Sequence, residues 1–445
     1  MSKRVKRASY LLFLLGTFSA TQIYLMGCLA ISELVIFPVA PFIFLKDLPE
    51  LRRHGFMPIF WLILANMFGC FICSWINGAW YMVIIKEEMV LYSMFAYIVV
   101  FHRLLKYGVR GICWLLLGQA LSLVITIFAF NARAGVSATN TVELREQSLD
   151  EMIGHPLFWI KRLYAFFRAL LCGWYGILPD LAYIAIFIFI SWFTLHDNVT
   201  GRSAAALSFL GLVLVLVAGK NRKKILSVKR KIVLFAVAVL CFVGGLKVVY
   251  TKLASSGSLG EKALNKFEAQ THGRTGFMDI IRGGRAEFFI GLSAIVDSPI
   301  MGYGVYAVDK KGYVMEYMSK YSDPMAMERY IKDSAKKGYC GIPSHSFVLS
   351  WWIGHGIVGL LIWLYVFYLI VKYFSSWMDA IPSLFPYIAF NVPNFTWNIL
   401  FSPYNDRVAP TLMITCILLA KAAKERKFFT DPIDMSLIAN KRSRW

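Results

Sequence analysis

A histidine and two glycines at fixed spacing mark the place where this chain could do chemistry. His345 and Ser346 are followed by nine residues and then by Gly356 and Gly359. The imidazole changes charge near neutral pH, so it can act as a general base toward a substrate hydroxyl. After His345 the chain reads SFVLSWWIGHGIVGLLIWLYVFYLIV, which is long enough to cross a bilayer at about 1.5 Å per residue. His345 is therefore predicted at a membrane face.

Arginines upstream of this histidine are the candidate anion-binding residues. They are Arg285 and Arg282 in a Gly-rich stretch, and Arg168 and Arg162 within residues 157–176. A guanidinium is permanently charged, and its planar fork binds a phosphate through two hydrogen bonds. Ionisable residues at membrane depth are costly and usually face a cavity or a partner, so residues 157–176 are a functional candidate. Because the loop carboxylates are scattered, without the spacing of metal ligands, a mechanism with no metal and no cofactor is predicted.

The elements that position these residues are predicted to be membrane helices. Hydrophobic residues make up 58% of the 445 residues and charged residues only 16%. The net charge of +21 comes from Lys and Arg in short loops between apolar runs, a pattern typical of cytoplasmic loops rather than of nucleic-acid binding. The eight cysteines are spread singly, most of them in apolar runs, which argues against a disulfide framework.

The apolar runs predict an all-α polytopic membrane protein with about 11–12 transmembrane helices. The candidate spans are residues 9–27, 28–45, 57–77, 89–102, 111–131, 176–195, 203–218, 232–250, 346–372, 379–391 and 408–421.

Basic segments predict which loops face the cytoplasm. The N-terminus and residues 46–54, 102–110, 220–231 and 421–427 are all rich in Lys, Arg or His, and the positive-inside bias favours the cytoplasmic side for each of them. An odd number of spans cannot satisfy all five. Either residues 157–176 also enter the membrane, or residues 220–231 face outward.

The predicted organisation has five parts. They are N-terminal transmembrane helices (1–131), central transmembrane helices with a first non-cytoplasmic loop (132–250), a large non-cytoplasmic loop (251–345), C-terminal transmembrane helices (346–427) and a cytoplasmic tail (428–445). Loops as long as 251–345 are uncommon unless they have a function. Within it we predict a short helix at about 285–297, stopped by Pro299 and Gly302, with irregular backbone after it.

These residues resemble the O-antigen ligase and polymerase family of bacterial envelope glycosyltransferases. The ligase signature is His-[Asn/Ser/Gln]-x9-Gly-x-x-[Gly/Thr/Tyr], and the segment from His345 to Gly359 satisfies every specified position. Upstream, Arg285 is followed by the run FFIGLSAIVDSPIMGYG. The resemblance covers about residues 160–375 and implies a many-helix transferase of the GT-C kind.

The resemblance also implies a reaction and residue roles. Such an enzyme takes a glycan from undecaprenyl diphosphate at the periplasmic face of the inner membrane and passes it to lipid A-core or to another lipid-linked glycan. Arg285 would hold the leaving pyrophosphate and His345 would be the general base. Arg168, with Arg162 as second choice, matches a further phosphate-contacting arginine of the family. Arg222 stands where the family carries a Ser-Arg pair, but Asn221 replaces the serine.

Three other functions remain open from the sequence, one of them a non-catalytic assembly protein that only binds lipid-linked sugar. A polysaccharide polymerase would use the same donor and similar residues, and the complete ligase signature favours the ligase. A flippase or transporter would also be polytopic with intramembrane arginines, but the chain shows no repeated halves. Gly356 and Gly359 are predicted to pack helices closely and so to seat His345.

Overall fold

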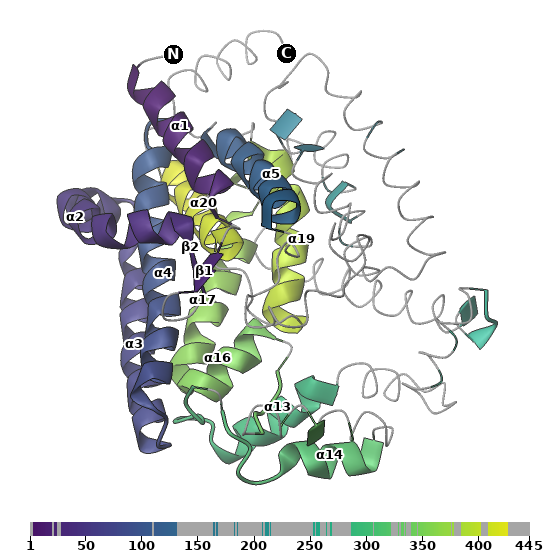
Figure 1. Ribbon diagram of the computed structural model, residues 1–445. Coiled ribbons are helices and arrows are strands. Elements are labelled where there is room, and N and C mark those ends of the chain that lie inside the picture. Colours follow the sequence, from purple (N-terminus) through teal and green to yellow (C-terminus); the bar gives the residue numbers. More distant parts are fainter. Residues whose placement is uncertain are drawn as a thin grey trace.

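The structure is mostly helical, which confirms the all-α prediction for the part of the chain that is described (Figure 1). The computed structural model describes residues 3–19, 22–24, 28–108, 111–130, 286–305, 307–321, 340–344, 346–374, 376–377, 384–401 and 408–425. It also describes short pieces between 163 and 268 and between 328 and 334.

Two N-terminal helices cross at very short distance. Helix α1 (Lys3–Thr17) packs along α5 (Gly111–Phe130). A Cβ on Gly16 would lie 2.3 Å from the Leu115 carbonyl oxygen, and Gly118 meets the backbone of α1 just as closely. Glycine is therefore required on both helices at the crossing.

A small hairpin follows α1, where the sequence predicted a continuing span. Strand β1 (Gln22–Tyr24) pairs antiparallel with β2 (Cys28–Ala30), and α2 (Ile31–Arg53) begins directly after it. The predicted span 9–27 is wrong, because its second half contains a paired strand rather than helix. The start of α2 is held by the Glu33 carboxylate, which accepts a hydrogen bond from the Ala30 backbone N–H at 2.9 Å.

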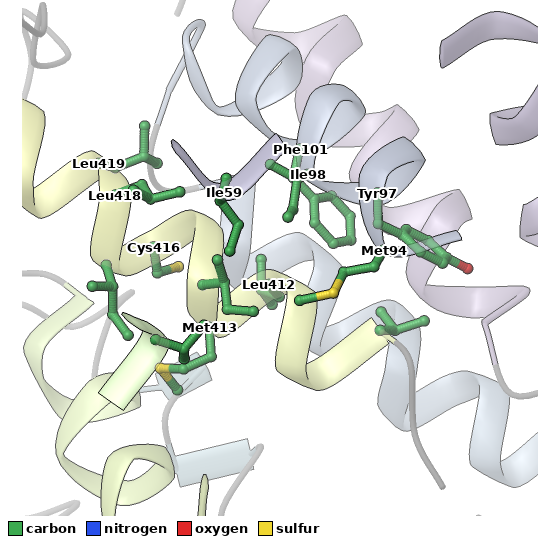
Figure 2. Close-up of a cluster of buried hydrophobic side chains, with 14 of the residues drawn as sticks. Ile59, Met94, Tyr97, Ile98, Phe101, Leu412, Met413, Cys416, Leu418 and Leu419 are labelled. Carbon is green, nitrogen blue, oxygen red and sulfur yellow. The ribbon is translucent and has the colours of Figure 1, made fainter. Parts of the chain in front are cut away.

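The core is formed around α4 (Tyr81–Leu105). Helices α2, α3 (Met57–Ile76) and α20 (Val408–Lys424) all pack against it. Figure 2 shows the contact between α4 and α20, in which Met94, Tyr97, Ile98 and Phe101 face Leu412, Met413 and Cys416. These side chains are almost completely buried.

Helix α4 is longer than the predicted span 89–102. It begins at Tyr81 and carries Lys86, Glu87 and Glu88 inside its second turn. The sequence prediction treated this charged triplet as the end of a loop. Of these three residues, Glu87 lies beside a polar residue of a neighbouring helix, His355, as described below.

Helix α3 has the character of a transmembrane helix. It is 20 residues long, an 18-residue window within it has a mean hydropathy of 2.0, and among the described residues it is the helix long and apolar enough to cross a membrane. Its exposed large side chains recur every three or four residues and form one stripe: Trp61, Leu64, Phe68, Phe71 and Trp75. Shorter apolar helices are Gly111–Ser122 and α17 (Ile357–Tyr373).

Three of the predicted cytoplasmic segments meet at one end of the molecule. The His54 and His102 rings lie within hydrogen-bonding distance (2.9 Å), and Arg103 pairs with Asp47. A Cβ on Gly55 would touch the Lys421 ammonium. The described parts of 46–54, 102–110 and 421–427 therefore share one side, as the sequence predicted; residues 220–231 lie outside the described residues.

The opposite end of α3 carries the described part of the predicted large loop. It holds α13 (Ala286–Asp297) and α14 (Tyr313–Tyr321), next to α16 (Phe347–His355) and α19 (Phe385–Phe401). Helix α13 confirms the helix predicted at 285–297. The prediction of irregular backbone after it is wrong for residues 313–321, because the Asp309 carboxylate accepts hydrogen bonds from the backbone N–H groups of Gly312, Tyr313 and Val314 and so starts α14.

Candidate functional site

The predicted span 346–372 is broken at the first glycine of the signature. Gly356 adopts φ +67° and ψ −153° and separates α16 from α17. A Cβ at this position would lie 2.0 Å from the Ile300 carbonyl oxygen. Both the backbone conformation and the lack of space require glycine here. One uninterrupted helix is therefore wrong for this segment.

The second glycine of the signature brings α17 back against α16. A Cβ on Gly359 would lie 2.0 Å from the Trp351 carbonyl oxygen and 3.1 Å from the His355 Cβ. The two helices are thus in backbone contact one turn after the break. This is the close packing that the sequence predicted for the two glycines.

The upstream Ser-Pro-x-x-Gly-x-Gly block packs into the same break. The backbone N–H of Ile357 donates to the Ile300 carbonyl at 3.0 Å, and that of Tyr303 donates to the Ile353 carbonyl at 2.6 Å. Gly302 has φ +69°, and a Cβ on it would lie 2.6 Å from the Ile353 oxygen. The two motif blocks of the sequence, which are separated by the 40 residues between Gly304 and His345, therefore form one structure.

Helix α16 fills the nine free positions of the signature. Ser346 is its N-cap, accepting a hydrogen bond from the Leu349 backbone N–H at 3.2 Å, and its hydroxyl donates to the Ile399 carbonyl of α19 at 2.9 Å. The last residue of α16 is His355, which directly precedes Gly356. The serine next to His345 thus fixes the start of this helix against α19.

The start of α13 borders the same end of α19. The ring of Phe288, in the first turn of α13, lies 6.2 Å from that of Phe401. Further along α13, Gly291 faces Leu349 and Ile353 of α16. The helices that directly follow Arg285 and His345 in the sequence therefore both begin beside the last turn of α19.

A comparison with known families identifies this region. A family model described as O-antigen ligase matches residues 184–364, a segment that contains both motif blocks. Over this segment, which is less than half of the chain, the sequence is similar to the O-antigen ligase family. No curated protein matches the chain.

Proteins of the O-antigen ligase family are membrane-bound, glycosyltransferase-like enzymes of the ligase and polymerase type that act on lipid-linked glycans. The match is shorter than the predicted resemblance over 160–375. Arg222, Arg282, Arg285 and His345 lie within the matched segment, whereas Arg162 and Arg168 precede it. All six of these residues lie outside the described residues.

A polar cluster lies beneath the break around His355, and its members Asn66 and Glu87 were not predicted from the sequence. His355 is 3% exposed; its Nδ1 lies 3.4 Å from the Asn66 Oδ1 and its Nε2 lies 3.5 Å from the Glu87 Oε1. The Asn66 amide also donates to the Val358 carbonyl of α17 at 3.0 Å. The cluster thus ties α3, α4, α16 and α17 together at the break. The charged triplet 86–88 between two apolar stretches was the available signal, because ionisable residues at membrane depth usually have a partner.

A second polar network joins α13 to α14 outside the membrane helices. Lys311 donates to the Asp297 carboxylate at 2.8 Å and the Tyr313 hydroxyl donates to it as well. Lys311 and Tyr313 together hold the pKa of Asp297 below its ordinary value. The pKa of Tyr313 is raised, mainly by burial and to a smaller extent by the hydrogen bond to Asp297. The Tyr303 hydroxyl lies 2.8 Å from that of Tyr313, so the network also holds the segment that packs into the break.

Within the described ranges, no group of three or more His, Cys, Asp or Glu residues is arranged to hold a metal ion.

Proposed function

We propose that this chain is an O-antigen ligase that transfers a glycan from undecaprenyl diphosphate to lipid A-core at the periplasmic face of the bacterial inner membrane. The observation that carries the proposal is the match to the O-antigen ligase family over a segment whose two motif blocks interlock at Gly356. The family accounts for the reaction, and the interlocking accounts for the fixed spacing of the signature.

In the proposed topology the chain crosses the membrane about 11–12 times with its basic end in the cytoplasm. The clustering of His54, His102 and Lys421 at one end of the described structure supports that orientation. Helices α13 and α14 lie at the other end and would face the periplasm, where the lipid-linked donor and the lipid A-core acceptor are both present.

In the proposed reaction, His345 removes the proton from an acceptor hydroxyl as that oxygen attacks the anomeric carbon of the donor. The bond between this carbon and the diphosphate oxygen breaks, and undecaprenyl diphosphate leaves with both electrons. Arg285 binds the negative charge that develops on the diphosphate, assisted by Arg282, Arg168 and Arg222, with Arg162 as the alternative to Arg168.

The described helices support this assignment of roles. Phe288 and Ser346, at the starts of α13 and α16, both contact the last turn of α19. Phe288 comes three residues after Arg285, and Ser346 directly follows His345. Helix N-termini carry partial positive charge that favours an anion. Two such termini at one place suit a diphosphate leaving group.

The test is transfer by purified protein from an undecaprenyl-diphosphate glycan to lipid A-core. We expect His345→Ala to lose transfer while retaining its elution profile, and Arg285→Lys to lose most of it because lysine lacks the planar fork. Arg52→Ala, at an exposed position on the basic end of the molecule, is the matched control and should retain activity. Full transfer by His345→Ala would refute the catalytic role.

A second measurement separates the ligase from the other functions. Deletion of the gene should leave polymer on the carrier lipid and remove it from lipid A-core. Single repeats attached to core would indicate a polymerase instead. Movement of lipid-linked glycan across liposomes without new glycosidic bonds would indicate a flippase.

A further inference from the structure

The segment between α13 and the isolated bridge at Val308 lies beside the last turns of α3 rather than beyond its end. The Cys73 thiol donates to the Met301 carbonyl, and the Ser74 hydroxyl accepts a hydrogen bond from the Val305 backbone N–H at 2.9 Å. Cys73 lies three residues before the end of α3 at Ile76, which corresponds to about 4–5 Å along the helix. Residues 301–305 are therefore at the depth of the apolar helix.

On its other side, the segment contacts residues that lie further from the end of α3 than Cys73 does. Ile300 accepts a hydrogen bond from the first residue of α17, Ile357. The next residue, Val358, faces Gly69 of α3. Gly69 is seven residues before the end of α3, about 10 Å along the helix axis. The segment thus enters the level of the membrane helices and leaves it again.

The backbone of the segment is satisfied by protein groups, as irregular structure within a bilayer requires. The Trp352 indole donates to the Pro299 carbonyl at 2.6 Å. The Ser298 hydroxyl donates to the Gly302 carbonyl, and the Tyr303 N–H donates to the Ile353 carbonyl. Proline has no N–H to satisfy. A loop lying in water would not need this degree of internal pairing.

The outward side chains of the segment are large and apolar. Ile300 is 68% exposed and Met301 is 41% exposed. Ile300 adjoins an exposed apolar stripe on α17 formed by Ile357, Leu361, Leu364 and Tyr368. Contiguous exposed apolar surface of this kind indicates a binding surface. Its continuity with a stripe at helical spacing on an apolar helix identifies bilayer lipid as the occupant.

We propose that residues 298–305 form a re-entrant segment, with Ile300 and Met301 inserted at the boundary between the lipid headgroups and acyl chains. The part of the predicted extramembrane loop that packs into the Gly356 break is then anchored by lipid as well as by protein. The proposal rests on the membrane location of the chain and not on its reaction, so it can fail while the proposed function stands.

Cysteine labelling tests the proposal in reconstituted full-length protein. Ile300→Cys, Phe68→Cys on the α3 stripe and Ser319→Cys on α14 are treated with a water-soluble maleimide on both sides of the vesicle, and each site is read by mass spectrometry so that native cysteines do not interfere. Ser319 is exposed and serves as the water reference. We expect Ile300→Cys and Phe68→Cys to label at least about tenfold more slowly than Ser319→Cys, because lipid disfavours the thiolate. A lipid-soluble maleimide should reduce this difference.

Two results would overturn the proposal. One is labelling of Ile300→Cys at the rate of Ser319→Cys, which would place the segment in water. The other is a disulfide-linked dimer through residue 300, which would assign the surface to a second copy of the chain. Met301→Cys, at another exposed position of the segment, provides an independent site should Ile300→Cys fail to reconstitute.

Discussion

The close contacts at the signature glycines predict a graded series of destabilised variants. Gly356 has both a glycine-only conformation and a backbone oxygen 2.0 Å from the missing Cβ. The conformation costs an alanine about 1–3 kcal/mol, and relief of the overlap costs about 1–3 kcal/mol more. We therefore expect Gly356→Ala to lower the free energy of unfolding by about 2–6 kcal/mol.

The chain offers a matched control for each part of this sum. Gly359 lacks a positive φ but has the overlap, so Gly359→Ala should cost about 1–3 kcal/mol. Gly78 has φ +74° and nothing within 4 Å, so Gly78→Ala should cost roughly 1–2 kcal/mol. Gly354 is helical, and a Cβ there would meet only an oxygen at 3.7 Å. Gly354→Ala should be neutral or stabilising, by up to about 1 kcal/mol.

Thermal unfolding followed by tryptophan fluorescence in one detergent would rank the four variants. The expected order of midpoints is Gly354→Ala highest, then Gly78→Ala, then Gly359→Ala, with Gly356→Ala lowest. If Gly356→Ala unfolded at the same temperature as Gly354→Ala, the break between α16 and α17 would be wrong. If Gly359→Ala alone matched wild type, the close contact between the two helices would be wrong.

Three further variants probe the supports of the site. Asn66→Ala leaves the buried Nδ1 of His355 without its partner and should cost about 1–3 kcal/mol, whereas Asn391→Ala, whose amide donates to Tyr387 within its own helix, should cost less in the same unfolding assay. Ser346→Ala should lower the unfolding midpoint, by about 0.5–2 kcal/mol in free energy, and Ser346→Asn should retain it because asparagine also caps helices; equal midpoints for the two would contradict the cap. Because the pKa of Asp297 is lowered in the folded state, its ion pair stabilises the protein above the ordinary pKa of 3.8 and the contribution is lost as pH falls through the lowered value. The midpoint difference between wild type and Lys311→Met should accordingly vanish at low pH, and a difference that stayed constant would show that Asp297 is not the partner that matters.

Local sequence pattern was sufficient for much of the fold. The apolar run 57–77 matches α3 within one residue. Helix α13 begins one residue after its predicted start and ends at its predicted last residue. Its end was predictable because Pro299 and Gly302 stop a helix through local effects alone. The common side of the basic segments was predictable as well, since charge near the ends of apolar runs sets orientation. These features depend on interactions between neighbouring residues in the sequence.

The features that the sequence did not predict depend on distant partners. An apolar helix tolerates glycine, so nothing around Gly356 indicates that Ile300 occupies the place of its Cβ. In the sequence, the charged residues 86–88 are typical of a loop. Only the structure shows that His355, more than 260 residues away, lies beside Glu87. For the predicted reacting residues, the sequence supplies identities and spacing, and their contacts stay predictions.

The spacing of the signature has a physical origin in helix α16. The nine unspecified positions are the nine residues of this helix, Phe347–His355. At about 1.5 Å per residue, it spans about 13–14 Å between the capping Ser346 and the break at Gly356. One residue more or fewer would rotate the two ends relative to each other by about 100°, so Ser346 could not bond α19 while Gly356 meets Ile300. The side chains within α16 can vary, but its length cannot. The specified serine and glycines thus hold the two ends of a rigid spacer, and they leave His345 as the one residue of the signature whose identity the helix geometry does not explain.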